Sequence, residues 1–162
     1  MKFMTNFQAE SKKVGDEFEA LVYQDLKNRG FETIDKDFYL ASTGCEVDFR
    51  AHGPRYEYVE CKGGNEGVGK RPGAKRTDNV KKAIANGALI KTIHDLYYVV
   101  YFSARPDVGS YSEEMINTAL KYKIIDEVRY IDQLPEKTIS DLIKEFKESN
   151  PEMFVAIEVE NG

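Results

Sequence analysis

The feature that most constrains this chain is an uninterrupted apolar run from Leu96 to Phe102, LYYVVYF. Its residues do not alternate with charged ones, as they would on a half-exposed strand, and they are far fewer than the roughly 20 that a membrane-spanning helix needs. Such a run is typical of a strand buried on both faces of its sheet. The chain is therefore expected to place helices on both sides of a central sheet.

Helical and strand patterns alternate along the rest of the chain. Ser11 supplies an N-cap, and Gly30 a stop, for a first helix with an apolar stripe. The residues 52–55 predict the turn of a hairpin. The whole pattern predicts helices at 11–29, 77–93, 111–122 and 136–149, and strands at 31–40, 46–51, 56–61, 96–102 and 128–131. The order α-β-β-β-α-β-α-β-α is that of an α/β domain with a mixed central sheet flanked by helices.

Length and composition place the chain among ordinary globular proteins. It has 162 residues, 41% hydrophobic and 31% charged, with no internal repeat or linker, so a single domain over 1–162 is predicted. No apolar run fits a membrane helix, and the N-terminus lacks the pattern of a signal peptide. Two cysteines, Cys45 and Cys61, are too few for a disulfide framework. The chain is therefore expected to be cytoplasmic, in a reducing setting.

Two short acidic motifs carry the chemical information. Glu60 and Lys62 are two residues apart on a predicted strand, so their side chains project from the same face. Asp48 lies on the preceding strand of the hairpin, and a turn centred between residues 53 and 54 places it opposite Val59 or Glu60. Two carboxylates and an ammonium are thus expected to converge at the end of a strand.

This set of side chains suits the hydrolysis of a phosphodiester bond. Mg²⁺ prefers carboxylate oxygens and completes its shell with water and substrate phosphate. The ion lowers the pKa of bound water, while Lys62 orients that water or stabilises the transition state. An isolated Glu-x-Lys is more often a surface ion pair. Here the apolar neighbours Val47, Phe49 and Val59 indicate half-buried strands, where unpaired charges are costly.

The order of these motifs resembles that of a known nuclease superfamily. The chain carries, in sequence, Gly15-x-x-Phe18-Glu19, Leu26, Gly30-Phe31, Gly44-x-x-x-Asp48 and Glu60-x-Lys62. This series is similar to the Mrr-type and Holliday-resolvase-type branch of the PD-(D/E)XK superfamily, and the likeness covers residues 14–132. Val47 stands where the name-giving motif has proline. The resemblance implies a restriction-endonuclease-like core and a metal-dependent deoxyribonuclease.

The resemblance also implies roles for individual residues. Lys62 would be catalytic, and Mg²⁺, for which Mn²⁺ can substitute, would bind to Asp48, Glu60 and the backbone carbonyl of Cys61. Glu19 on the first helix would be the accessory acid and a further metal ligand. Periodicity alone does not choose between Glu19 and Glu17, because they lie at opposite edges of the apolar stripe. A plain surface position for Glu19 is the alternative, and Asp25 falls within the same stripe without an evident reason.

A cluster of basic residues follows the last motif. Six cations fall within thirteen residues: Lys70, Arg71, Lys75, Arg76, Lys81 and Lys82. Such a cluster can contact DNA phosphates even though the net charge of the chain is −5. The alternative is a solvated loop followed by the charged face of a helix.

Other enzyme classes fit the sequence less well. The residues 64–70 match the pattern of a phosphate-binding loop, but Arg71 replaces its Ser or Thr, and Pro72 prevents the helix that should follow. No nucleotide cofactor is therefore expected. Two histidines, His52 and His94, are too few for a zinc hydrolase or a histidine-based nuclease.

The sequence leaves the biological substrate open. A restriction-type endonuclease, a structure-specific junction, nicking or end-processing nuclease, and a catalytically inactive DNA-binding module all share this core. DNA is the expected partner, and no association with a membrane is expected. A homodimer is also expected, because a double-strand break requires two centres and the chain carries one.

Overall fold

A computed structural model describes residues 6–63, 71–131, 144, 146–149 and 151, with side chains described from residue 15 onward. Its helices are α1 (Asn6–Asn28), α2 (Thr77–Ile93) and α3 (Tyr111–Lys121), with a short 3-10 helix η1 (Gly73–Lys75). Its strands are β1 (Thr33–Leu40), β2 (Cys45–His52), β3 (Tyr56–Lys62), β4 (Tyr98–Phe102) and β5 (Glu127–Tyr130). None of the described helices combines the length and the apolar character that a membrane crossing requires.

The five strands form one mixed sheet in the order β1-β2-β3-β4-β5. The pairs β1–β2 and β2–β3 are antiparallel hairpins, whereas β3, β4 and β5 run parallel. Parallel neighbours require crossover connections, which α2 and α3 provide. The predicted α/β class, the mixed sheet and the order of elements are confirmed.

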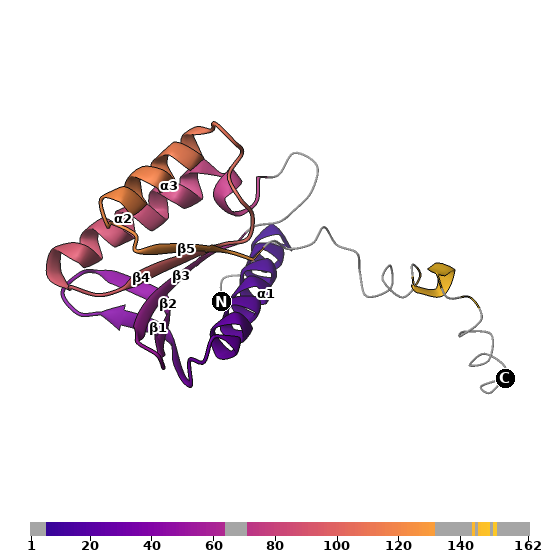
Figure 1. The fold of residues 1–162 in the computed structure, drawn as a ribbon, viewed down its shortest axis with the longest axis horizontal. Helices are drawn as coiled ribbons and strands as arrows, with labels where there is room; N and C mark the ends of the chain where they lie inside the picture. Colours follow the sequence, from indigo (N-terminus) through magenta and orange to yellow (C-terminus); the bar gives the residue numbers. More distant parts are fainter. Residues whose placement is uncertain (1–5, 64–70, 132–143, 145, 150, 152–162) are drawn as a thin grey trace. The chain divides into compact units, whose positions relative to one another are not determined.

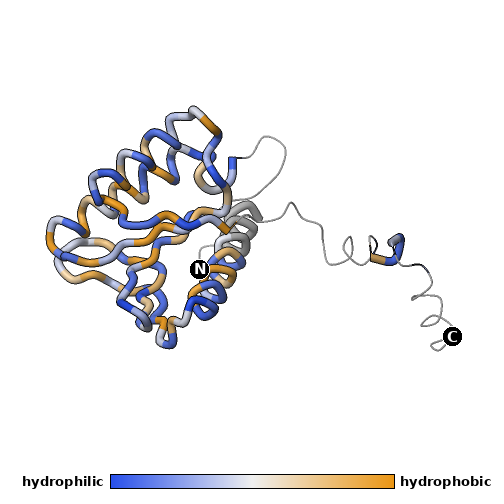
Figure 2. The backbone as a smooth tube through the Cα atoms, in the orientation of Figure 1, coloured by the Kyte–Doolittle hydropathy of each residue, from blue (hydrophilic) through white to orange (hydrophobic). Residues whose placement is uncertain are grey.

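Two hydrophobic clusters lie on opposite faces of the sheet. One is built around Phe18, Val22 and Leu26 of α1, and the other includes buried residues of α2 and α3. Figure 1 accordingly shows α2 and α3 together on one side of the sheet and α1 on the other. Figure 2 shows hydrophobic residues along the central strands between these helices.

The strand β4 has the environment that its apolar sequence predicts. All five of its residues are fully buried. Val99 and Tyr101 belong to the cluster under α1, while Tyr98, Val100 and Phe102 belong to the cluster under α2 and α3. Successive side chains of a strand point to opposite faces, so β4 is apolar throughout because both of its faces are covered.

The ends of the elements differ from the sequence expectations in several places. The helix α1 begins at Asn6, so Ser11 lies inside the helix and the N-cap predicted there is wrong. Good helix formers before Ser11, such as Ala9 and Glu10, allow the helix to extend. Of the helix predicted at 136–149, the described residues 144 and 146–149 are helical and the others lie outside the described residues.

The chain divides into two compact units, Met1–Asp132 and Gln133–Gly162, and the whole sheet belongs to the first.

Candidate active site

The strand β3 brings Glu60 and Lys62 to one face of the sheet at its carboxyl end. The ammonium of Lys62 lies 2.6 Å from Oε1 of Glu60, and the Glu60 residue is only 5% exposed. The amide of Asn86, on α2, donates a hydrogen bond of 3.4 Å to the same oxygen. Among the described residues, the other oxygen, Oε2, is buried and has no hydrogen-bond partner. A buried carboxylate oxygen without a partner is costly unless something positive binds to it.

Asp48 reaches the same place from β2. The pairing of β2 with β3 runs from His52–Tyr56 to Phe49–Val59, and continuing that register places Asp48 opposite Glu60. There the Asp48 side chain interacts with β3, because its Oδ2 accepts a hydrogen bond of 2.6 Å from the backbone N–H of Cys61. The two carboxylates predicted to converge therefore lie close together at the carboxyl end of β3.

The pairing of β1 with β2 is interrupted at Asp48, which lies between the helices on the two faces of the sheet. Asp37 of β1 has a φ of 52°, and the regular pairing omits the step between Lys36–Phe49 and Phe38–Val47, where Asp37 and Asp48 would face each other. On the two sides of this step, Val47 joins the cluster under α2 and α3, whereas Phe49 joins the cluster under α1. Asp48 therefore lies at the twist in β2 where the buried side chains change from the cluster under α2 and α3 to the cluster under α1.

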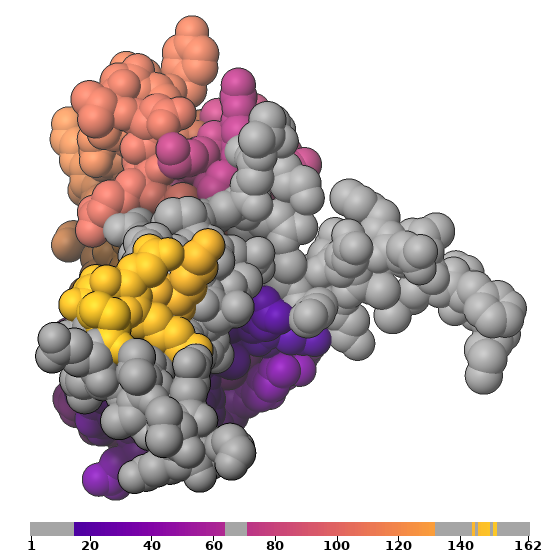
Figure 3. Space-filling model, turned by 90° about the vertical axis from the view of Figure 1, so that its right-hand side faces the viewer, coloured from indigo at the N-terminus to yellow at the C-terminus, as the bar shows by residue number. Residues whose placement is uncertain are grey.

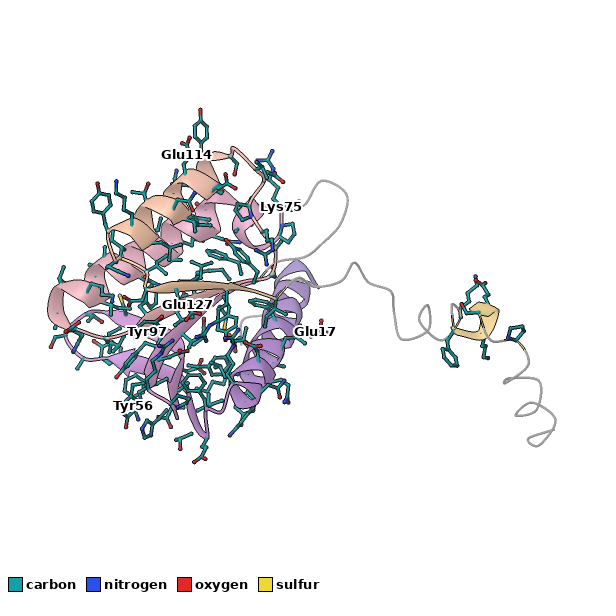
Figure 4. All side chains as sticks on the ribbon, in the orientation of Figure 1. Glu17, Tyr56, Lys75, Tyr97, Glu114 and Glu127 are labelled. Atoms are coloured by element: carbon teal, nitrogen blue, oxygen red, sulfur yellow. The ribbon has the colours of Figure 1, made fainter. Side chains whose placement is uncertain are left out.

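Glu19 of α1 approaches Asp48 from the opposite layer. Its side chain is 21% exposed and lies 3.4 Å from the ammonium of Lys36. Burial, and then the negative charge of Asp48, raise the pKa of Glu19. Glu17 is exposed, and Figure 4 shows it on the outer side of α1. The structure thus brings Glu19 into the electrostatic field of Asp48, while Glu17 lies exposed on the same helix.

Close packing fixes α1 against this strand end. Gly63 follows directly after β3, and a Cβ atom placed there would lie 2.9 Å from Cδ1 of Phe18. Phe18 is buried one position before Glu19. A side chain larger than hydrogen at Gly63 would therefore displace the part of the helix that carries Glu19.

The electrostatics of the site favour a bound cation. Burial, and then the charge of Glu60, raise the pKa of Asp48 to about 6. Burial also raises the pKa of the Cys61 thiol, so this cysteine is a neutral neighbour. Three carboxylates thus act on one another across the end of β3, and a divalent ion would relieve both their repulsion and their desolvation.

The donor set fits Mg²⁺ or Mn²⁺ as an open site. The described residues hold no group of three or more His, Cys, Asp and Glu side chains arranged to enclose a metal ion. An ion here would therefore bind to Asp48 and Glu60, and the Cys61 carbonyl, water and substrate would fill its remaining positions. This is the usual arrangement for Mg²⁺, which keeps several waters and takes one or two carboxylates.

The predicted basic cluster extends from Arg71, before η1, into the first turns of α2. Lys70 lies outside the described residues, and the other five predicted phosphate contacts are all exposed: Arg71, Lys75, Arg76, Lys81 and Lys82. Lys75 lies 3.4 Å from Asp107, and Lys82 lies 3.4 Å from Asp78. In Figure 3 the segment that follows residue 70 (magenta) and α3 (orange) share one part of the surface. Figure 4 labels Lys75 there.

Two residues of the site were not anticipated from the sequence. Asn86 is the one side-chain amide in the otherwise apolar stretch from Ala83 to Ile90. An isolated polar residue in such a stretch is the sequence signal that could have indicated a role in the site. Asp37 has the positive φ at which the hairpin twists, and its negative charge adds to that of Glu60 in raising the pKa of Asp48. No sequence pattern distinguishes Asp37 from an ordinary exposed residue of β1.

The position of Asp25 within the apolar stripe of α1 also has a structural explanation. Its carboxylate accepts hydrogen bonds of 2.7 Å from the Tyr101 hydroxyl and from Nε of Arg29. The Tyr101 hydroxyl in turn accepts a bond of 2.9 Å from Arg129, which binds both oxygens of the buried Glu57 at 2.8 Å. Asp25 is thus the helix end of a polar network that ties α1 to the sheet.

Comparisons with protein-family models, with curated proteins and with solved structures gave no match for this chain.

Proposed function

We propose that this chain is a divalent-metal-dependent deoxyribonuclease that hydrolyses phosphodiester bonds, of the PD-(D/E)XK type. The observation that carries the proposal is the carboxylate of Glu60. One of its oxygens is held by Lys62 and Asn86, while the other is buried without a partner among the described residues. Asp48 lies beside it, and burial together with the charge of Glu60 raises its pKa, so a nearby cation would favour its ionised form.

Each side chain has a distinct part in the proposed reaction. Asp48 and Glu60 would hold Mg²⁺, and the bound ion would supply a water of lowered pKa and positive charge to offset that of the phosphate. The ammonium of Lys62 is partly exposed, at 19% of its side chain, so it can donate to a phosphate oxygen or to the attacking water without leaving the site. Glu19, in the field of Asp48, orients a water molecule or supports a second ion.

Phosphate contacts are proposed for the exposed cations before and at the start of α2. Arg71 and Arg76 form no ion pair with another residue in the described part of the chain, so both are available for a DNA backbone. Lys75 and Lys82 each have an acidic partner, which DNA would have to displace. A cytoplasmic location is proposed as well, because Cys45 and Cys61 are both free thiols.

The proposal is tested with a panel of DNA substrates. Supercoiled, linear, single-stranded and four-way-junction DNA are incubated with the protein in Mg²⁺, in Mn²⁺ and in EDTA. We expect metal-dependent cleavage of at least one substrate, lost in Asp48→Ala and Glu60→Ala while DNA binding is retained. Glu17→Ala is the matched control, since it removes an exposed carboxylate from the helix that carries Glu19.

The same panel separates the enzyme from an inactive DNA-binding module. A module would cut none of the four substrates, and Mg²⁺ or Mn²⁺ would not strengthen its binding to DNA relative to EDTA. The substrate that is cut also distinguishes a restriction-type endonuclease from a junction, nicking or end-processing nuclease. Cleavage that survives in both Asp48→Ala and Glu60→Ala would assign the activity to another site or to a contaminant.

A further inference from the structure

The middle of α2 exposes small and apolar side chains where a solvent-facing helix normally carries charged ones. The eight residues from Ala83 to Ile90 contain no charge, although Ala85, Ala88 and Leu89 among them are exposed. Leu89 is 52% exposed, and Ile93, one turn later, is 51% exposed. A surface helix places charged and polar residues on its outer face, and contiguous exposed apolar residues mark sites of association.

An apolar hollow between α2 and α3 continues this surface. Its volume is about 750 Å³, and its lining includes Ile84 and Ala85 from α2 with Tyr111 and Met115 from α3. Tyr111 is 79% exposed at its edge. Ala85, which lines the hollow, lies one turn before Leu89, and Leu89 lies one turn before Ile93, so the exposed stripe begins at the hollow and runs along the outer surface of α2. We call this surface the α2–α3 face, defined by Ala85, Ala88, Leu89, Ile93, Tyr111 and Met115.

The charges around the hollow are opposite in sign. Lys81 of α2 and Glu114 of α3 both line it, and both are exposed. Neither forms an ion pair with another residue in the part of the chain that the structure describes. Figure 4 shows Glu114 on the side of α3 away from the sheet. Under a two-fold axis, Lys81 of one copy can meet Glu114 of the other, so the face is self-complementary.

The dimensions also suit a second copy of the chain. A helix of the length of α2, at about 1.5 Å per residue, presents a face about 25 Å long. Two adjacent helices, with axes about 8–10 Å apart, make it roughly 20 Å wide including side chains, which gives about 500 Å² per copy. Two such faces together bury about 1,000 Å², the lower limit for a specific protein–protein interface. DNA is a poor fit, since the middle of the stripe carries no cation.

We propose that the α2–α3 face is the interface of a homodimer, formed by two copies around a two-fold axis. Leu89 and Ile93 supply the apolar centre, Tyr111 packs at the hollow, and Lys81 pairs with Glu114 of the partner subunit. Association through the outer sides of α2 and α3 does not depend on whether the chain cleaves DNA.

The test measures the mass of the full chain in solution by sedimentation over a wide range of protein concentration. We expect a dimer for the wild type and a dissociation constant raised at least about 100-fold by Leu89→Glu together with Ile93→Glu. Leu21→Glu is the matched control, because Leu21 is 45% exposed on α1. Circular dichroism confirms that each variant is folded. A monomeric wild type, or a dimer that Leu21→Glu dissociates and the double variant does not, overturns the proposal.

A charge exchange tests the two-fold arrangement itself. Lys81→Glu and Glu114→Lys should each weaken the dimer several-fold, because each places like charges opposite one another across the axis. The two substitutions together should restore the wild-type dissociation constant. If the double exchange is as weak as the sum of the single ones, the two residues do not meet across an interface and the proposed arrangement is wrong.

Discussion

At the scale of single residues, the raised pKa of Asp48 links the candidate site to the stability of the fold. Its pKa rises from 3.8 to about 6, first through burial and then through the charge of Glu60. The folded protein therefore binds the proton more tightly than the unfolded chain does. This contribution to stability is fully present below about pH 4 and is lost as the pH rises through 6. At neutral pH and without metal, ionised Asp48 destabilises the fold by up to about 3 kcal/mol.

Asp48→Asn should consequently stabilise the metal-free protein. In EDTA at pH 8 we expect the free energy of unfolding to rise by about 1–3 kcal/mol, because the amide keeps an oxygen for the Cys61 N–H and loses the charge. The gain should shrink toward pH 4.5. Urea denaturation at both pH values measures it, with Glu46→Gln, exposed on the same strand, as control. An equal gain at both pH values would contradict the shifted pKa.

Lys62→Ala should separate catalysis from metal binding. The ammonium pairs with Glu60 and cannot bind a cation, so its removal leaves both carboxylates and reduces local positive charge. We expect Mn²⁺ affinity, measured by calorimetry, to stay equal or rise slightly. Single-turnover cleavage should slow by about 100-fold or more, because the lost contact acts in the transition state. An unchanged cleavage rate would reduce Lys62 to a salt-bridge partner of Glu60.

The residues of the site could be predicted only in part. Glu60 and Lys62 follow from the two-residue repeat of a strand, and Asp48 from the register of a short hairpin. Glu19 could not be chosen over Glu17 by periodicity, since the choice depends on which edge of α1 faces the twisted hairpin. Asn86 comes from a helix far along the chain, and its contact with Glu60 is created by tertiary packing alone.

At the scale of elements, the network centred on Tyr101 ties the helix α1 to the sheet. The hydroxyl of Tyr101 lies between Asp25 of α1 and Arg129 of β5, while Arg129 holds Glu57 of β3. Burial raises the pKa of Tyr101, so the hydroxyl keeps its proton and remains a donor. One side chain of β4 thus links a helix to two other strands.

Tyr101→Phe should therefore loosen α1. Removal of the hydroxyl leaves Arg129 with one acceptor fewer in a buried position, which we expect to lower the free energy of unfolding by about 1–3 kcal/mol. Urea denaturation measures the loss, and Tyr56→Phe, at a residue 50% exposed, is the control with little expected effect. Equal effects of the two variants would show that the hydroxyl network does not support the helix.

The elements differ in how far their sequences determine them. The helix α2 begins and ends at the predicted residues, and the strand β4 was evident because both of its faces are covered. The start of α1 was placed too late, because a capping residue such as Ser11 is also tolerated inside a helix. The twist at Asp37 has no local signature, since a positive φ at aspartate arises from its neighbours in the folded hairpin.

At the scale of the whole molecule, the net charge of −5 opposes association with DNA. Binding must then come from cations that are locally free of acidic partners. Among the described residues near the start of α2, Arg71 and Arg76 meet this condition, whereas Lys75 and Lys82 lie near Asp107 and Asp78. The overall repulsion and the local attraction both depend on ionic strength, but the slope of affinity with salt counts the phosphates that are neutralised.

Arg71→Ala combined with Arg76→Ala should lower DNA affinity alike for all sequences. Each phosphate contact contributes about 0.9 to the slope of log affinity against log salt, so the double variant should reduce that slope by about 2. Fluorescence anisotropy in EDTA measures binding without cleavage. The control is Lys121→Ala with Lys123→Ala, which removes the same charge from exposed positions at and just after the end of α3 and should leave the slope nearly unchanged, because neither residue is a proposed phosphate contact. If both double variants reduce the slope equally, DNA responds only to the total charge of the molecule, and Arg71 and Arg76 form no specific contact.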